Sequence, residues 1–355
     1  MDGGLEGVVA AETVLTHVDG SQGIWWLRGH TLPEVIAGHG YEGAAALLWQ
    51  GFVADTLDRE QIRAAFAAGR RLAFARLPRW LGAANGSSPG EALRLGIASV
   101  PDDAAPAEIA AFFPVAVAAL LRQRRDEAPV PPEPALATAA DFLRMLTGAA
   151  PEPARTAALD AYLTTVIDNG LAASTFAARV IASTRASLPA AVLGGYCALT
   201  GPLHGGAPGP VLDMLDAIGD AASIDPWLER ALDRGERLMG FGHRVWRLRD
   251  PRADALKAAL AKLGPDAGRV AFAEEVERRA LAALQRRKPD HPLETNVEFY
   301  TALLLDAVGL PRDTFTPVFA LARSVGWIAH ALEQRHTGRL IRPAATYIGP
   351  RPVAA

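Results

Sequence analysis

Apolar residues recur along most of the chain at the three- and four-residue spacing of amphipathic helices. A different pattern covers residues 14–29, which alternate apolar and polar side chains around an Asp19-Gly20 turn and predict a small β-hairpin. We therefore expect an all-α protein with one N-terminal hairpin. The predicted helices cover about 58–76, 106–122, 136–147, 154–167, 225–238, 251–263, 268–287 and 313–334.

Local signals add detail to this pattern. Ser88, Pro89 and Glu91 form a capping box that predicts the start of a further helix. Another helix is expected to begin near Pro208 or Pro210, because proline is favoured in the first helical turn. The segment "DEAPVPPEPAL" holds four prolines and predicts an extended surface connector.

Composition limits the kind of partner. A chain of 355 residues with 50% hydrophobic content can bury a large core, and we expect two domains. Its 36 basic and 39 acidic residues form no like-charge run, so neither nucleic acid nor a membrane surface is expected as a partner. A small-molecule partner is the expectation.

Cysteine usage and the termini bear on location. The single Cys197 excludes a disulfide framework and is expected to be a buried apolar residue. The N-terminus shows no signal-peptide pattern, and the longest apolar run, Ile109–Leu121, is too short to span a bilayer. We expect a soluble cytoplasmic protein.

A first candidate for chemistry is His204 in "GPLHGGAPGP". Glycines let a ligand approach closely, and the following helix would place the imidazole at its positive end, which favours the neutral form. A neutral imidazole can donate a hydrogen bond to a carbonyl oxygen as charge builds on it. The alternative is a turn histidine bonded to nearby backbone.

A second candidate is His243 in "MGFGHRVWRLRDPR". Arginines at 244, 247, 249 and 252 follow it, and guanidinium groups pair with carboxylates and phosphates in two-bond geometry. The cluster indicates a site for a polycarboxylate or a phosphorylated cofactor. A solvated helix start with outward-pointing arginines is the alternative.

A third candidate is Glu298 at the opening of the apolar segment "ETNVEFYTALLL". Apolar neighbours can raise the pKa of a carboxylate toward that of a useful base. The alternative is a first-turn glutamate that interacts with the helix dipole.

Other kinds of site find little support. No G-x-S-x-G nucleophile motif and no glycine-rich phosphate loop follows a predicted strand. We expect no metal, because the remaining histidines lack the ligand spacing of zinc sites. These histidines are His17, His30, His39, His291, His330 and His336.

The order and the amino-acid sequences of the three candidate motifs resemble those of the citrate synthase family. "GPLHGGA" resembles the family's first catalytic-histidine motif, "GFGHRVWRLRDPR" the second, and "NVEFYTALL" the segment with the catalytic carboxylate. Further similar segments are "GLEGVVAAET", "ASTFAARVIAST", "FALARSVGWIAHALEQ" and "RLIRPAATYIG", so the resemblance covers essentially the whole chain.

The resemblance implies a two-domain helical fold and a homodimer. The large domain would comprise residues 1–206 and 311–355, and the small domain, with CoA-binding and catalytic residues, 207–310. The implied activity is that of an acyltransferase of the tricarboxylic acid cycle, which condenses acetyl-CoA with oxaloacetate to give citrate and CoA. Acetyl-CoA would be a co-substrate, with no metal and no tightly bound cofactor.

The resemblance also assigns catalytic and supporting roles. Glu298 would be the base for the acetyl methyl group, His204 the hydrogen-bond donor to the thioester oxygen, and His243 the donor to the oxaloacetate ketone. Ser174 would hold His204, and Asn169 stands at an oxaloacetate-contacting position.

Binding roles follow from the same resemblance. Oxaloacetate carboxylates would be bound by Arg252, Arg323 and Arg342, and Arg342 would come from the neighbouring subunit. The residues expected to bind CoA are Leu238, Gly240, Phe241, Gly242, Arg247, Lys288 and Asn296.

The chain departs from the family pattern at several positions. Glu298 replaces the usual aspartate, and its extra methylene moves the carboxylate by about 1 Å, which can reduce the rate on the order of 100-fold. Asn169 and Ala172 replace a histidine and an asparagine, so a positive charge near oxaloacetate is lost, which would weaken binding by roughly 1.5 to 3 kcal/mol if that charge mattered. Pro208 replaces an asparagine often found after "HGGA".

These departures leave three hypotheses. The first is a citrate synthase with an altered pocket. The second is a related condensing enzyme with another acyl-CoA or 2-oxo acid, such as a 2-methylcitrate synthase. The third is a catalytically weak regulatory paralogue, against which the presence of both His204 and His243 counts.

Overall fold

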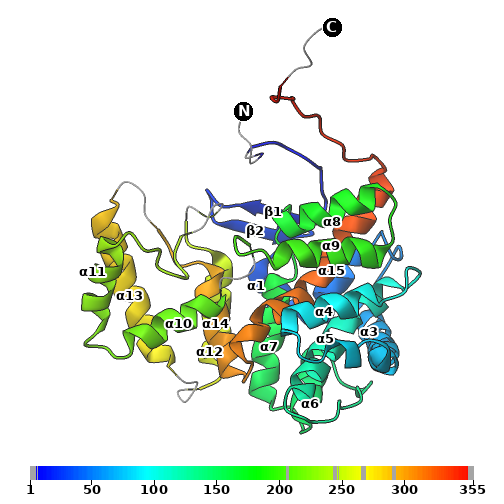
Figure 1. The fold of residues 1–355 in the computed structure, drawn as a ribbon, viewed down its shortest axis with the longest axis horizontal. Coiled ribbons are helices and arrows are strands. Elements are labelled where there is room, and N and C mark those ends of the chain that lie inside the picture. Colours follow the sequence, from blue (N-terminus) through cyan, green and yellow to red (C-terminus); the bar gives the residue numbers. More distant parts are fainter. Residues whose placement is uncertain are drawn as a thin grey trace.

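The computed structural model describes residues 5, 7–204, 208–242, 246, 248–264, 269–289 and 293–350. Within these residues it is an all-α protein of fifteen α-helices with one small sheet, as the sequence predicts (Figure 1).

Most predicted helices are confirmed within a few residues, because long amphipathic patterns have one way to bury their apolar face. The first helices are α1 Leu32–Gly38, α2 Gly40–Trp49, α3 Arg59–Arg76, α4 Pro89–Ala98, α5 Pro106–Gln123, α6 Thr138–Thr147, α7 Pro153–Val166 and α8 Ala173–Ser183. They are followed by α9 Leu188–Leu199, α10 Pro208–Ile218, α11 Ile224–Asp233, α12 Pro251–Ala261, α13 Val270–Arg287, α14 Val297–Ala307 and α15 Phe315–Thr337. Short 3₁₀ turns lie at Leu77–Arg79, Gly82–Ala84 and Arg312–Thr314.

The predicted N-terminal hairpin is confirmed and gains a third strand. β1 (Thr16–Asp19) pairs antiparallel with β2 (Ile24–Leu27), which pairs with β3 (His30–Thr31). The Asp19 carboxylate accepts the backbone N–H of Ser21 at 2.9 Å and so closes the predicted turn. The sequence did not predict β3, because a strand of two residues is too short to show an alternating pattern.

Helix α5 forms the centre of the large helical group. It is long and apolar enough to cross a membrane, but 72% of it is buried inside the protein, and it packs against α3, α6 and α15. It is therefore a core helix. A buried ion pair of 2.7 Å between Arg70 and Asp141 joins α3 to α6 beside it.

The helices from α10 to α14 gather on one side of the molecule, and the other helices and the sheet lie on the other side (Figure 1). Helices α12 and α14 both pack against α7, which makes α7 the element between the two groups. The predicted division at 207–310 stays a prediction.

Two details of the sequence prediction are wrong. Helix α11 ends at Asp233 rather than near 238, since Gly235 takes a φ of +71° that a helix cannot continue. Cys197 is exposed rather than buried, because it lies on the outer face of α9, whereas its neighbour Tyr196 points into the core. The capping box at Ser88, the helix beginning at Pro208 and the non-helical connector at 126–136 are confirmed.

Candidate active site

His204 lies next to the first turn of α8. Its Nε2 atom is 2.8 Å from the Ser174 hydroxyl and accepts the Ser174 backbone N–H at 3.3 Å. The Trp327 indole N–H donates to the same hydroxyl oxygen at 3.1 Å, so the hydroxyl proton is directed to His204. With Nε2 accepting, the proton of a neutral ring belongs on Nδ1. This arrangement leaves Nδ1–H as a donor for a ligand.

The surroundings of His204 favour this neutral form. Burial, and secondly the positive charge of Arg323, lower the pKa of His204 to about 4. The ring also lies at the positive N-terminal end of α8, beside fully buried Ser174. At neutral pH the imidazole is therefore an uncharged hydrogen-bond donor.

The start of α14 is tied to the loop that contains the second predicted motif. Asn296 caps the helix by accepting the Glu298 backbone N–H at 3.0 Å, and its amide donates to the Gly242 carbonyl at 2.7 Å. Backbone bonds of 2.9 Å from Asn296 N to Gly240 O and 2.8 Å from Gly242 N to Glu294 O complete the pairing. This pairing fixes Glu298 relative to the loop that leads to position 243.

Glycine is required at position 240 by both conformation and space. Gly240 has a φ of +86°, and a Cβ atom there would lie 2.8 Å from the Phe299 ring. The loop can therefore approach α14 closely only with glycine at this position.

Glu298 is half-buried in the first turn of α14. Burial raises the pKa of its carboxyl group to about 7; Asp250 acts in the same direction, and Arg252 and Arg323 oppose it. Its carboxylate makes no hydrogen bond to the residues that the structure describes. A carboxylate with this pKa is suited to accept a proton near neutral pH.

Two of the three predicted carboxylate-binding arginines are buried near Glu298. Arg252 donates to both oxygens of Asp250, at 3.0 and 2.8 Å. Arg323 donates to the Val166 carbonyl at 2.9 Å and lies over the Phe319 ring. Burial is the main reason that the pKa of Arg323 falls to about 10, so it stays charged at neutral pH. The sequence did not reveal Asp250 as the partner of Arg252.

Arg342 lies away from these two arginines. It is exposed in the extended segment after α15, which runs away from the body of the molecule (Figure 1). The structure therefore does not bring it together with Arg252 and Arg323 within one chain.

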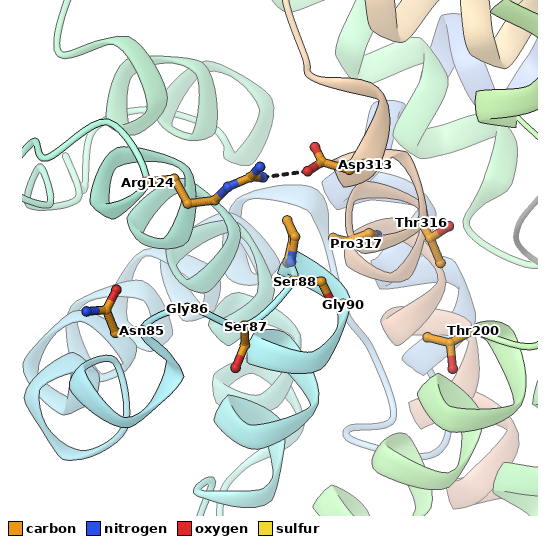
Figure 2. A pocket seen from close by; sticks show the side chains of 11 residues that line it. Asn85, Gly86, Ser87, Ser88, Gly90, Arg124, Thr200, Asp313, Thr316 and Pro317 are labelled. Carbon is orange, nitrogen blue, oxygen red and sulfur yellow. Dashed lines mark hydrogen bonds and ion pairs between the residues drawn. The ribbon is translucent and has the colours of Figure 1, made fainter. Parts of the chain in front are cut away.

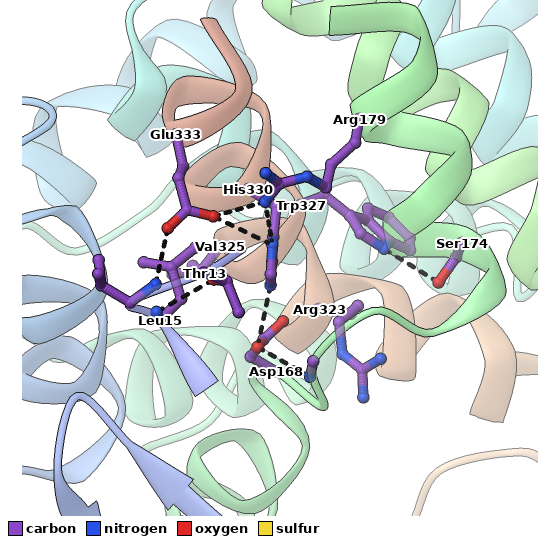
Figure 3. A network of polar contacts seen from close by, with 12 residues as sticks. Thr13, Leu15, Asp168, Ser174, Arg179, Arg323, Val325, Trp327, His330 and Glu333 are labelled. Carbon is purple, nitrogen blue, oxygen red and sulfur yellow. Dashed lines mark hydrogen bonds and ion pairs between the residues drawn. The ribbon is translucent and has the colours of Figure 1, made fainter. Parts of the chain in front are cut away.

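A buried network that the sequence did not reveal fixes the loop around Asn169 (Figure 3). The Asp168 carboxylate accepts His330 Nε2 at 3.2 Å and the Gly170 backbone N–H at 3.1 Å. Because Arg179 can only donate, its 2.9 Å contact makes His330 Nδ1 an acceptor and Nε2 the protonated atom. The partners are about 150 residues apart in sequence, so no local pattern could indicate them.

The network also reaches the N-terminal segment. Arg179 pairs with Glu333 at 2.5 Å, and Glu333 accepts the backbone N–H of Val14 at 2.9 Å. Asn169, between Asp168 and Gly170, is half-buried, and its side-chain oxygen has no hydrogen-bond partner within the described part of the chain.

The remaining predicted CoA-binding positions are only partly described. Leu238 and Phe241 are buried, and Phe241 packs against Phe299 at 5.4 Å between ring centroids. Lys288 is exposed directly after α13. His243 and Arg247 lie outside the described residues.

A surface pocket of about 660 Å³ lies elsewhere, between the loop before α4 and the start of α15 (Figure 2). The 2.6 Å ion pair between Arg124 and Asp313 lies at this pocket, and none of the predicted site residues lines it. Among the described residues no group of three or more His, Cys, Asp or Glu side chains is placed to hold a metal ion. The candidate active site therefore remains the one around Glu298.

Comparisons with known proteins show the family to which the chain belongs. A model of the family described as citrate synthase, C-terminal domain, matches residues 4–344. Relatives from Mycobacterium tuberculosis and Mycobacterium bovis are 50% identical over 205 residues, which are 57% of this chain and 54% of theirs. The chain thus spans about half the length of these curated relatives.

Other relatives match almost the whole chain. A citrate synthase from Haloferax volcanii is 37% identical over 98% of this chain and 96% of its own. A 2-methylcitrate synthase from Mycobacterium tuberculosis is 33% identical over 98% of this chain and 90% of its own.

Solved structures agree with the fold. A citrate synthase from Thermotoga maritima has a TM-score of 0.88 and 31% identity, covering 100% of this chain and 98% of that one. A ternary complex of carboxymethyl coenzyme A and oxaloacetate with the citrate synthase from Thermoplasma acidophilum has a TM-score of 0.85 and 26% identity, with coverage of 100% and 98%.

The predicted all-α fold and the predicted resemblance to the citrate synthase family are confirmed. The chain belongs to the citrate synthase family.

Proposed function

We propose that this protein condenses acetyl-CoA with oxaloacetate and releases citrate and CoA. The observation that carries the proposal is the position of buried Arg323 between the two predicted catalytic residues. It lies one turn of α15 from Trp327, which holds the Ser174 hydroxyl beside His204. It is anchored by the Val166 carbonyl on α7, which packs against α14 and its Glu298. A neutral imidazole donor, a carboxylate base and a carboxylate-binding cation thereby share one site. These are the groups that enolisation of the acetyl group and binding of the acceptor need.

The first step is enolisation of the acetyl group. Glu298 takes a proton from the acetyl methyl, and electron density moves onto the thioester oxygen. His204 Nδ1–H donates to that oxygen, while Ser174 and Trp327 hold the ring from the other side. Because the ring is already neutral, it can stabilise the charge without losing its own proton first.

The second step forms the carbon–carbon bond. The enol carbon attacks the ketone carbon of oxaloacetate, and the ketone oxygen becomes the hydroxyl of the product, with His243 as proposed proton donor. Water then hydrolyses the thioester, which gives citrate and free CoA. The solved relative in complex with carboxymethyl coenzyme A and oxaloacetate supports this pair of ligands.

Acceptor binding falls to Arg252 and Arg323. Asp250 fixes the orientation of the Arg252 guanidinium, which leaves its remaining N–H groups for a carboxylate. Asn169 takes the place of the family's usual histidine and donates through its amide, without a positive charge. Acceptor affinity is correspondingly lower than a charged residue would give.

The proposal includes a homodimer in which the neighbouring subunit supplies Arg342. The exposed position of Arg342 on an extended segment supports this arrangement. It also includes two domains, residues 1–206 with 311–355 and residues 207–310, and CoA binding by the loop around Gly240. The cytoplasmic location, the role in the tricarboxylic acid cycle and the lack of a tightly bound cofactor stay predictions.

A second candidate is condensation of a longer acyl-CoA, supported by the similarity to a 2-methylcitrate synthase over 98% of this chain. One methylene in an apolar pocket is worth about 1–3 kcal/mol, so modest changes in pocket shape decide between the two acyl groups.

The test is thiol release by the purified protein with acetyl-CoA and propionyl-CoA, each against oxaloacetate and a panel of other 2-oxo acids. We expect the highest kcat/KM with acetyl-CoA and oxaloacetate. A preference for propionyl-CoA would establish the second candidate. A folded protein without thiol release for any pair would contradict both and favour the regulatory paralogue.

A further inference from the structure

Tyr162 is a buried polar residue for which the mechanism above has no use. It lies on α7 with 0% of its surface exposed, and its hydroxyl has no hydrogen-bond partner within the described part of the chain. Buried hydroxyl groups nearly always have a partner, and exceptions often mark functional sites. An unpartnered phenol therefore calls for a partner, and none of the described residues provides one.

The position of Tyr162 points to the active site. It precedes Val166 by one helical turn, and the Val166 carbonyl is the anchor of Arg323. Helix α7 also packs against α14, whose first turn contains Glu298. The charge of Glu298 adds to burial in raising the pKa of Tyr162, and Arg323 opposes it. The phenol thus lies within electrostatic reach of both site residues.

Among the described residues, Glu298 lacks a hydrogen-bond donor, just as Tyr162 lacks an acceptor. Its carboxylate is half-buried and makes no hydrogen bond to described residues, so no described side chain fixes its orientation. Glutamate has one more rotatable bond than the aspartate usual in the family, which lengthens its reach but leaves its carboxylate less well placed. A hydrogen-bond donor on α7 would hold the longer side chain in place.

We propose that Tyr162 is a positioning residue whose hydroxyl donates a hydrogen bond to the Glu298 carboxylate in the working enzyme. This inference rests on the proposed function. The hydrogen bond holds the carboxylate in one rotamer and favours its charged form, which keeps the base ionised at lower pH. The longer base and the buried phenol then act as one unit.

The full burial of Tyr162 favours Glu298 over a substrate as its partner. A ligand that approaches from solvent does not meet a side chain with 0% exposure, whereas Glu298 lies on α14, which packs against the helix that contains Tyr162.

The test compares Tyr162→Phe with the wild type in pH profiles of kcat/KM for acetyl-CoA. We expect the acidic limb to move up by about one pH unit, so that kcat/KM at pH 6 falls about five- to tenfold while the value at pH 9 is unchanged. The KM for oxaloacetate should stay constant.

Tyr196→Phe is the matched control. Tyr196 is equally buried, but its hydroxyl donates to the Gly90 carbonyl at 2.8 Å, away from the site. This variant should lower the melting temperature and leave the pH profile unchanged. An unshifted profile in Tyr162→Phe would overturn the inference, and a selective rise in the KM for oxaloacetate would reassign the phenol to the substrate.

Repeating the test in a Glu298→Asp variant shows whether the effect of Tyr162 depends on the longer glutamate side chain. In a Glu298→Asp enzyme the shorter carboxylate cannot reach the phenol, so adding Tyr162→Phe should change the profile no further. A shift that persists in this background would contradict the inference. If the wild type shows no turnover, which refutes the proposed function, carbon-13 NMR titration of Glu298 with and without Tyr162→Phe still tests the contact.

Discussion

At the scale of single residues, the raised pKa of Glu298 links the proposed activity to stability. The folded-state pKa of about 7 lies above the ordinary value of 4.5, so between these pH values the native state binds more protons than the unfolded state. The contribution of Glu298 to stability therefore falls as pH rises from 4.5 to 7. Removing the charge should reverse this loss.

Glu298→Gln is accordingly expected to raise the free energy of unfolding by about 1–3 kcal/mol at pH 8 and to have little effect at pH 4. Denaturant unfolding at both pH values measures the difference. An equal effect at both pH values would mean that the carboxylate is not destabilised by burial.

Ser174 is the residue that orients His204. Ser174→Ala removes the hydroxyl between His204 and Trp327, so the imidazole loses the contact that fixes its tautomer. We expect kcat to fall about 10- to 100-fold, with a loss of stability of about 1 kcal/mol. Ser324→Ala is the control, because the hydroxyl of that buried serine donates to the Leu321 carbonyl of its own helix. Equal kcat values for the two variants would remove Ser174 from the mechanism.

At the scale of elements, the pairing of the Gly240 loop with the start of α14 positions the base. Gly240→Ala is expected to destabilise the protein by about 2–4 kcal/mol and to reduce kcat, since a Cβ atom would strike Phe299. Gly235→Ala is matched in φ, at +71°, but meets nothing within 4 Å. The difference between the two variants in urea unfolding isolates the contact with Phe299, and the absence of a difference would show that the loop can shift.

The sequence predicted these elements well where the signal was local. Helix α4 follows from its capping box at Ser88, and the hairpin follows from the alternation around Asp19. The partners of Asp168 and the position of Tyr162 could not be predicted, because a buried aromatic residue on a helix looks the same in sequence whether or not it faces a site. Candidate residues such as Ser174 came from resemblance to the family rather than from their own chemistry.

At the scale of the whole molecule, the proposed dimer should complete each active site with the partner's arginine. A heterodimer of Glu298→Gln and Arg342→Ala subunits then contains one intact site, so mixing the two inactive variants should restore about a quarter of wild-type activity after subunit exchange. Mixing Glu298→Gln with Arg323→Ala is the control, because those residues share one subunit's site. If neither mixture gains activity, Arg342 acts within its own chain or not at all.

The measurement that tests the whole account most directly is carbon-13 NMR of the products formed from methyl-labelled acetyl-CoA and oxaloacetate. The account predicts that the label appears in a citrate methylene with the wild type, and that Glu298→Gln lowers this rate by at least about 1,000-fold while the protein stays folded. Label that appears only as free acetate, or a Glu298→Gln enzyme that forms citrate at the wild-type rate, would contradict it.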